Sequence, residues 1–234
     1  MAKGKLDDAV ALLERTRSET IYPFLGKASG KGGINMTSSQ IGTSIGKSDI
    51  FIVANGDLNL GKTALPAAGK ISKKTGITTG GGGAINIFAI GDVNVNESRI
   101  MTFYGGDIVW SDQGNINAGR GSRTAVSASP PKVNEDGTQV FSPPAIGSGI
   151  RAVTYGENPP EPGNIHLFAP TGIIDAGEAE ISGGKIVLAA TQVLNVQNIN
   201  FSVGSVGVPM TGPSQSTAGP VSYTHLTLPT IYSV

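Results

Sequence analysis

The stretch Asp49-Ile-Phe-Ile-Val-Ala-Asn-Gly-Asp-Leu-Asn-Leu-Gly61 returns, with altered residues, as Ala84-Ile-Asn-Ile-Phe-Ala-Ile-Gly-Asp-Val-Asn-Val-Asn96. Further copies begin at Asp107, at Asn164 (with one inserted residue) and, more weakly, at Lys185. Each copy has two short alternating apolar stretches joined at a polar or glycine-containing corner. Such a unit cannot bury its apolar face alone and must stack on its neighbours. The sequence therefore predicts an all-β fold, a parallel β-helix or β-solenoid.

The spacing of the copies predicts the coil length. The copies start at 49, 84, 107, 164 and 185, so the gaps are 35, 23, 57 and 21 residues. The short gaps indicate a coil of about 21–23 residues, and the long ones hold insertions. We expect a solenoid over 33–210 with inserted loops at 66–76, 129–142 and 156–163. Seven or eight coils about 4.8 Å apart make a rod of roughly 35 Å.

The second insertion carries its own folding signal. Paired prolines flank it, and Asp136-Gly137 lies between Val133 and Val140. An Asp-Gly pair between such positions predicts a β-hairpin. Insertions project from one face of a solenoid and often form its binding surface, so this hairpin is the first candidate for binding and the 156–163 loop is its neighbour.

Alternation along the copies predicts which side chains point inward. These are Ile50, Ile52, Leu58, Ile85, Ile87, Val93, Ile108, Ile116, Ile165, Leu167, Ile186 and Leu188. Asn59, Asn94 and Asn117 recur between inward positions, either facing solvent or forming a side-chain ladder, and a structural role is favoured. Glycines mark the corners, at Gly56, Gly91 and Gly114 and then at Gly61 and Gly119.

The totals exclude several classes of protein. Seventeen basic and seventeen acidic residues cancel, so nothing favours nucleic acid or an anionic membrane as a partner. Cysteine is absent, which excludes disulfides and thiolate metal sites. The 34 glycines suit a chain that turns often. No apolar run approaches a membrane span and no signal peptide is apparent, so we expect any export signal to lie outside this chain.

The two ends differ from the repeats. In 1–32, Leu6, Val10, Leu13 and Arg17 follow helical spacing, which predicts one short helix over Lys5–Thr20. Residues 211–234 are expected to be an unstructured tail. Within it, Val221-Ser-Tyr-Thr-His-Leu-Thr-Leu-Pro-Thr230 resembles the translation of a transposase adaptor used for sequencing libraries. We therefore expect 221–234 to be adaptor read-through, and the chain to be part of a longer protein.

Enzymatic chemistry has few candidate residues. Polysaccharide lyases and hydrolases also use parallel β-helices and need clustered carboxylates, or calcium with an arginine base. The candidates are Asp49, Asp57, Asp92, Asp107, Asp112 and Asp175, with Arg99, Arg120, Arg123 and Arg151. Asp57 and Asp92 are equivalent corner residues whose third equivalent is Asn115, while Asp49 and Asp107 align with Ala84 and Asn164. Corner aspartates of this kind usually bond the local backbone.

Other motifs are weaker still. His166 alternates with Ile165 and Leu167, so it should face outward, and one histidine cannot support a metal site or a triad. Gly80–Gly83 is followed by neither Gly-Lys-Ser/Thr nor a helix, so it predicts a corner and not a phosphate-binding loop. We therefore expect no catalytic, cofactor-binding or metal-binding residues and no cofactor.

Several phrases, in order, resemble a known family. They are Gly80–Arg99, Gly105–Ser111, Gly114–Gly121, Thr124–Pro131, Gly147–Arg151 and Thr191–Asn195. Together they resemble the C-terminal region of the filamentous haemagglutinin family of outer-membrane proteins, very large exoproteins of Gram-negative bacteria, over most of 33–210. The resemblance implies a right-handed parallel β-helix, exported by two-partner secretion through an outer-membrane pore and displayed or released at the cell surface. The right hand also follows from the crossover rule.

Three functions remain open at this stage. The favoured one is a structural and adhesive segment, without enzymatic activity, of a secreted or surface-displayed exoprotein. Its partners would be a host-cell surface, a neighbouring bacterial cell or a matrix glycan. The alternatives are a β-helix carbohydrate-active enzyme, which needs a carboxylate cluster in a groove, and the stalk of a toxin-delivery protein, which differs only in sequence beyond about Pro220.

Overall fold

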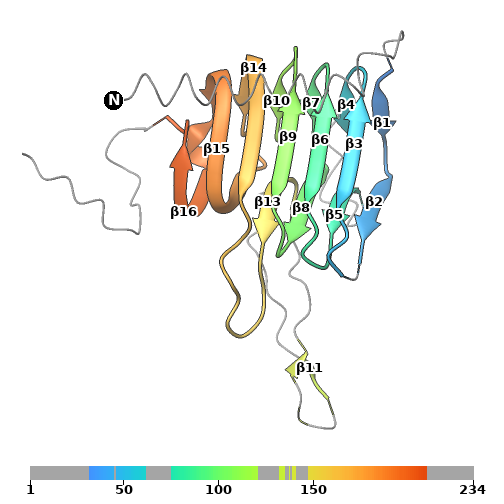
Figure 1. Ribbon diagram of the computed structural model, residues 1–234, viewed down its shortest axis with the longest axis vertical. Helices are drawn as coiled ribbons and strands as arrows, with labels where there is room; N and C mark the ends of the chain where they lie inside the picture. Colours follow the sequence, from blue (N-terminus) through green and yellow to red (C-terminus); the bar gives the residue numbers. More distant parts are fainter. Residues whose placement is uncertain are drawn as a thin grey trace, which may run out of the picture.

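The computed structural model describes residues 32–44, 46–61, 75–120, 132–134, 137, 139–140 and 147–209. Within them the chain winds into a coil, and its strands pair in parallel with the turns before and after (Figure 1). The exception among these residues is a two-stranded antiparallel pair outside the coil. The predicted all-β parallel β-helix is confirmed. Its right-handed sense remains the expectation of the crossover rule.

Each turn of the coil contributes strands to three faces, which we call A, B and C. Face A stacks β1 (Ile34–Met36), β4 (Leu58–Leu60), β7 (Val93–Asn94), β10 (Ile116–Asn117) and the ends of two long strands, β14 (Ile165–Asp175) and β15 (Ile181–Leu194). Face B stacks β2 (Gln40–Thr43), β5 (Gly76–Thr79), β8 (Arg99–Phe103), β13 (Gly149–Val153) and the starts of β15 and β16 (Ile199–Val206). Face C stacks β3 (Ile50–Ala54), β6 (Ile85–Ala89), β9 (Asp107–Ser111), the start of β14 (Ile165–Asp175), the middle of β15 (Ile181–Leu194) and the end of β16.

The repeated phrase of the sequence corresponds to a face C strand, a corner and a face A strand. The register confirms this, since Ile50 pairs with Ile85 and Leu58 pairs with Val93. In the last turns the corners become continuous strand: β14 runs from face C to face A, with a register shift between Ala169 and Ile173. A short 3-10 turn, η2 (Val196–Asn198), precedes β16.

Face B did not follow from the repeats. It falls in the gaps between copies, and β5 begins at Gly76, the last residue of the loop expected at 66–76. Its inward row is an unbroken isoleucine ladder, in which Ile41, Ile77, Ile100, Ile150, Ile181 and Ile199 pair successively. Because successive members belong to adjacent turns, each isoleucine packs on the next and fills the third side of the core.

The core is one continuous cluster enclosed by the three faces. Eleven of the twelve predicted inward residues are buried: Ile50, Ile52, Leu58, Ile85, Ile87, Val93, Ile116, Ile165, Leu167, Ile186 and Leu188. The prediction for Ile108 was wrong. β9 pairs Asp107, not Ile108, with Ile85 and Ile165. A shift of one residue exchanges the two faces of a strand, so Asp107 and Val109 point inward.

The described coil is shorter than expected. Face A holds six strands, from β1, β4, β7, β10, β14 and β15. Five intervals of about 4.8 Å give a stack of roughly 24 Å. The expectation of seven or eight coils was too high. It divided the whole length of the region by 21–23 residues per turn, whereas two of the turns also contain long insertions.

The corner between faces A and B requires a left-handed backbone conformation. Gly61, Asn96, Gly119, Gly177 and Asn195 occupy it in successive turns, with φ of 67°, 54°, 100°, 57° and 54°. Glycine and asparagine adopt this conformation most readily. A Cβ on Gly119 would lie 1.9 Å from the Asn96 carbonyl oxygen, so glycine is also needed for close stacking there.

Several expectations fall outside the described residues. These are the helix over Lys5–Thr20, the linker up to residue 31, most of the 66–76 loop, and the tail with its 221–234 segment. The division of the chain into these regions stays a prediction. No helix able to cross a membrane is found in the described part of the chain.

Candidate interaction surface

The corner between faces C and A carries a ladder of aspartate and asparagine side chains. Oδ1 of Asp57 accepts the backbone N–H of Asp92 at 2.9 Å, and Oδ1 of Asp92 accepts that of Asn115 at 2.7 Å. Asn115 in turn accepts the N–H of Ile173 at 2.9 Å. Asp57 and Asp92 are thus corner neighbours, as predicted. Each side chain bonds the backbone of the next turn, so the ladder holds turns together.

A second polar ladder follows the outer side of face A. The Asn59 amide donates to Asn35 Oδ1 at 2.9 Å, and the Asn94 amide donates to Asn59 Oδ1 at 3.0 Å. Further along, Asn195 donates to Asp175 Oδ1 at 2.6 Å. Asn59 and Asn94 therefore both lie on the outer side of the sheet and form a side-chain ladder. Asn117 Oδ1 instead accepts the N–H of Gly119 in its own turn at 2.8 Å. The main role of the ladder is to link turns.

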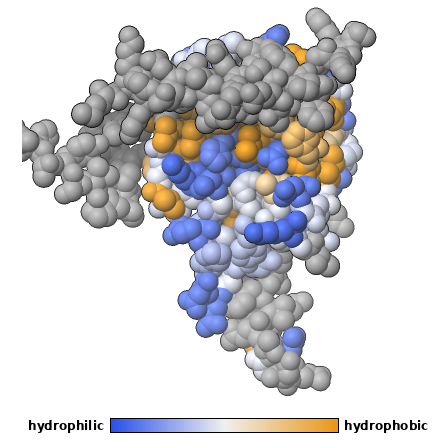
Figure 2. Space-filling view, viewed as in Figure 1, coloured by the Kyte–Doolittle hydropathy of each residue, from blue (hydrophilic) through white to orange (hydrophobic). Residues whose placement is uncertain are grey.

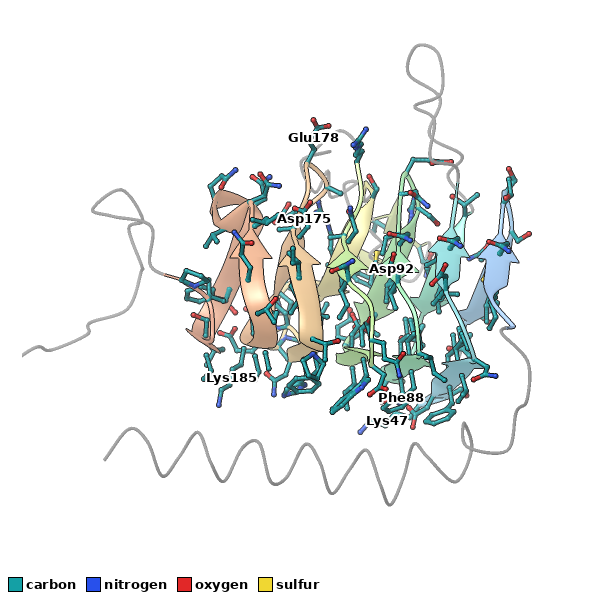
Figure 3. All side chains as sticks on the ribbon, turned by 90° about the horizontal axis from the view of Figure 1, so that it is seen from above. Lys47, Phe88, Asp92, Asp175, Glu178 and Lys185 are labelled. Carbon is teal, nitrogen blue, oxygen red and sulfur yellow. The ribbon has the colours of Figure 1, made fainter. Side chains whose placement is uncertain are left out.

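The two ladders border an open polar groove of about 510 Å³. Its walls are Gly33, Asn35, Asn55, Gly56, Asp57, Asn59, Ile90, Gly91, Asp92, Gln113 and Gly114. The groove presents amide and carboxylate groups, and Figure 3 shows Asp92 and Asp175 well apart from Phe88, which lies along the opposite edge. No group of three or more metal-binding side chains occurs among the described residues. The groove therefore offers hydrogen bonds to a polar ligand and lacks a metal-centre arrangement.

The remaining candidate residues do not converge. Oδ1 of Asp49 accepts the N–H of Ala84 at 2.8 Å, as a corner residue does. Arg99 and Arg151 lie on face B, Arg120 is exposed, and Arg123 falls outside the described residues. Among the described candidates the structure brings Asp57 close to Asp92, whose carboxylates both bond the backbone, and Arg99 close to Arg151 on face B.

Arg151 forms a buried ion pair on face B. Its guanidinium lies 2.9 Å from Glu180 and donates to the Ala179 carbonyl at 3.0 Å. Burial lowers the pKa of Arg151, and the Glu180 carboxylate opposes that shift. Burial also lowers the pKa of Arg99, and the neighbouring Arg151 lowers it further. Since the ion pair spans two adjacent turns, it fixes β13 against the start of β15.

Asp107 is enclosed in the core, which corrects its alignment with Ala84 and Asn164. It is fully buried, and neither carboxylate oxygen makes a hydrogen bond to the described residues. Burial raises its pKa well above the usual range; a hydrogen bond from Thr102 would lower it. The Thr102 hydroxyl, however, donates to the Gly105 carbonyl at 2.8 Å. Burial therefore disfavours the charged form of the Asp107 carboxyl group in the folded coil, and the side chain is closed off from solvent.

His166 faces outward, as predicted, and is half-buried beside Phe168, with ring centroids 6.4 Å apart. Burial lowers its pKa, a hydrogen bond with the Asp107 backbone raises it, and Lys185 lowers it.

A loop between β13 and β14 projects from the coil. Residues 157–161 are exposed, and the Thr154 hydroxyl bonds the Pro160 carbonyl at 2.7 Å. At its base, the Tyr104 and Tyr155 rings lie 5.2 Å apart, and Phe103 meets Tyr155 edge-on at 5.4 Å. Tyr104 is 38% exposed. Sequence reasoning marked the loop but missed the tyrosines, because Tyr104 and Tyr155 are 51 positions apart in the chain and meet only when the turns stack.

The hairpin predicted in the 129–142 insertion is present. β11 (Lys132–Val133) and β12 (Gln139–Val140) pair antiparallel, and the Gly137 N–H bonds the Asn134 carbonyl at 3.0 Å. Figure 1 shows β11 and the loop between β13 and β14 projecting beyond the same end of the face B and C strands. The hairpin and the loop between β13 and β14 therefore project from the same side of the coil, which we call its irregular side.

Part of this coil matches the model of a known protein family. Residues 105–210 match the family described as "Filamentous haemagglutinin family outer membrane protein". The filamentous haemagglutinin match runs from the start of β9 to just beyond β16, so it includes the projecting loop and the hairpin. It confirms the resemblance over that part of the chain. The turns before β9 belong to the same coil but lie outside the matched residues. No curated protein and no solved structure matches the chain significantly.

Proposed function

We propose that this chain is a structural and adhesive segment of a large exoprotein that is secreted or displayed at the bacterial cell surface. The filamentous haemagglutinin match supports a surface or secreted adhesin-like protein. Four of the candidate aspartates support a non-enzymatic role, because Asp49, Asp57 and Asp92 bond the backbone at corners and Asp107 is enclosed in the core. Export through a partner pore in the outer membrane is part of the same proposal.

The coil acts in this proposal as a stiff support. Backbone ladders run through all three faces, and the Asp and Asn side chains add bonds between turns. In a solenoid each turn contacts only its neighbours, so these bonds set the stiffness along the axis. A stiff rod keeps a projecting surface at a fixed distance from the cell that displays it.

The observation that carries the adhesive part is the irregular side of the coil. The hairpin and the 154–163 loop both interrupt regular turns there, and the Tyr104–Tyr155 pair lies at the base of the loop. Aromatic rings with polar tips offer an apolar face and a hydrogen-bonding group together. The C–H face of a sugar ring stacks on such a surface. A glycan of a host cell, of a neighbouring bacterium or of the matrix is therefore the partner we propose.

Deletion of the hairpin tests this function. Residues 132–141 are replaced by a short Gly/Ser link in the chain displayed on a non-adherent bacterium, and adhesion to glycan-coated surfaces is measured. We expect the coil to keep its thermal midpoint and adhesion to fall. Tyr104→Ala is the companion variant for the loop, and Gln192→Ala, at an exposed position that does not line the groove, is its control. If both the deletion and Tyr104→Ala leave adhesion intact, the binding surface lies elsewhere.

A further inference from the structure

The polar groove between the two ladders crosses four turns of the coil. Its lining comes from β1, β4, β7 and β10 and from the corners directly before them. Three intervals of about 4.8 Å give it a length of roughly 14 Å along the coil axis. A groove of this length, with a volume of about 510 Å³, has the proportions of a site for a short extended chain.

Bare backbone forms part of the groove. Gly56, Gly91 and Gly114 occupy the same corner in successive turns. A Cβ at Gly91 would lie 2.0 Å from Asp57 Oδ1, and one at Gly114 would lie 2.4 Å from the Gly91 carbonyl carbon. The ladder therefore requires glycine at both positions. Because no side chains fill this column, a ligand has close access to the backbone.

The walls of the groove carry hydrogen-bonding groups that the fold does not use. Asp57 and Asp92 bond the next turn through Oδ1, and Oδ2 of each makes no hydrogen bond to the described residues. Gln113 is exposed, and its side chain makes no hydrogen bond to the described residues either. Carboxylates accept hydrogen bonds, and carboxamides both accept and donate them. The groove thus presents both kinds of group to a ligand.

The corner ladder does not need the negative charges of Asp57 and Asp92. Asn115, its next member, accepts the N–H of Ile173 at 2.9 Å, so an amide oxygen makes the same bond. Asn115 does not line the groove, whereas both aspartates do, and no lysine, arginine or histidine is among the lining residues of this described part of the chain. The groove therefore repels anions.

The composition of the groove disfavours other classes of ligand. Among the described residues that line it, Ile90 has the single apolar side chain, so a lipid or an apolar peptide has little surface to bury against. β4, β7 and β10 are paired on both sides, so they offer no edge to an added strand. Hydrophobic residues gather instead over face C in Figure 2, where Phe88, Trp110 and Phe168 lie on adjacent strands.

We propose that the groove binds a linear, uncharged glycan, which lies along the coil axis with one sugar residue for each turn. The polar groups of the walls repeat at about 4.8 Å, and a pyranose residue in an extended chain has nearly this length. Its hydroxyl groups donate to the carboxylates and exchange hydrogen bonds with the carboxamides. The two negative charges exclude uronic acids and sulfated sugars.

This inference rests on the proposed function in taking a glycan as the partner, and it adds a site away from the irregular side. Figure 1 shows β4, β7 and β10 at one end of the face C strands and β11 beyond the other. The two sites therefore respond to different variants.

Soluble tetrasaccharides test the groove without any measurement of adhesion. Uncharged linear tetramers of glucose, galactose and N-acetylglucosamine are each titrated into the isotope-labelled full chain and followed by NMR. We expect at least one of them to shift the amide signals of Gly33, Gly56, Gly91 and Gly114, which line the groove. The tetramer of galacturonic acid should leave these signals unchanged. No shift with any uncharged tetramer, or equal shifts with the acidic one, overturns the proposal.

Groove variants give a second readout. Gln113→Ala should weaken binding of the uncharged tetramer at least threefold, while Gln192→Ala, at an exposed position outside the groove, leaves it unchanged. Asp57→Asn combined with Asp92→Asn preserves the ladder bonds, as Asn115 does, and should reduce the preference for the uncharged tetramer over the acidic one at least tenfold. Thermal midpoints verify the fold. Unchanged affinity and preference in these folded variants overturn the proposal.

The chain lacking residues 132–141 separates this inference from the proposed function. Tetramer binding equal to that of the wild type supports the groove, even if adhesion falls. Loss of tetramer binding together with the hairpin overturns the groove and assigns glycan binding to the irregular side. A wild-type chain that confers no adhesion but shifts the groove signals contradicts the adhesive function and supports the groove as a glycan site.

Discussion

Asp107 occupies a position that the neighbouring turns fill with isoleucine. Ile85 precedes it and Ile165 follows it in the same inward row. The register there could not be read from the repeat, because the copy beginning at Asp107 aligns without a gap to the copies at 49 and 84, and that alignment places Ile108 inward. The paired strands differ from it by one residue: Asp107 pairs with Ile85 and Ile165, after a corner of Tyr104-Gly-Gly in which Tyr104 has φ 64°.

Replacing Asp107 by isoleucine should stabilise the fold. The change removes a buried carboxyl group that has no hydrogen-bond partner, and such a group costs roughly 1–3 kcal/mol of stability. It also buries an aliphatic side chain in its place. We expect the free energy of unfolding in urea to rise by about 2 kcal/mol or more. The reverse change, Ile165→Asp, serves as control and should lower it strongly. A loss of stability in Asp107→Ile would show that the carboxyl group has a partner in the core.

The raised pKa of Asp107 also predicts a pH dependence. Below the unfolded pKa of about 3.9 the carboxyl is protonated in both states and costs no ionisation energy. As pH rises above that value the unfolded state ionises first, so stability falls until the folded pKa is reached. Asp107→Asn lacks this titration. We expect the stability of Asp107→Asn relative to wild type to increase from pH 4 upward, in urea titrations at several pH values. A difference that is constant over this range would contradict the pKa shift.

At the scale of elements, the sequence predicted two faces of the coil and missed the third. Faces A and C carry the repeated phrase, in which apolar and polar residues alternate. Face B has no such alternation: all five residues of β8, Arg99–Phe103, are buried. On the outer side of face B, side chains contact ion-pair partners or other side chains and not solvent, as Arg151 does with Glu180. A strand buried on both sides loses the period-two signal, so neither the isoleucine ladder nor the tyrosine pair at the loop base could be predicted.

Truncation within the isoleucine ladder measures the contribution of face B. Ile100 is fully buried between Ile77 and Ile150, so Ile100→Ala should lower the free energy of unfolding by about 2–5 kcal/mol. Ile41→Ala, in the same row at the first turn, is the matched control; Ile41 is 40% exposed and should lose much less. Similar losses at both positions would mean that the first turn is covered in solution.

For the whole molecule, the projecting elements were more predictable than the groove. The hairpin and the 156–163 loop are local interruptions of a repeat, so prolines and an Asp-Gly pair reveal them in the sequence. The groove and the apolar outer side of face C, with Phe88, Trp110 and Phe168 on adjacent strands, arise only when turns are stacked, because their residues come from separate turns of the chain. Stacking converts single outer residues into continuous surfaces, one polar and one apolar.

Adhesion conferred by this chain alone tests the account most directly. The chain is displayed on a non-adherent bacterium, its surface level is measured with a tag antibody, and attachment to glycan-coated and host-cell surfaces is counted. The matched control displays Gly119→Ala, whose Cβ clashes with the Asn96 carbonyl and disrupts the stacking at the base of the hairpin insertion. We predict that the wild-type chain confers attachment and that this variant confers less. Attachment no greater than that of cells without the chain, at equal display of folded protein, would contradict an adhesive function.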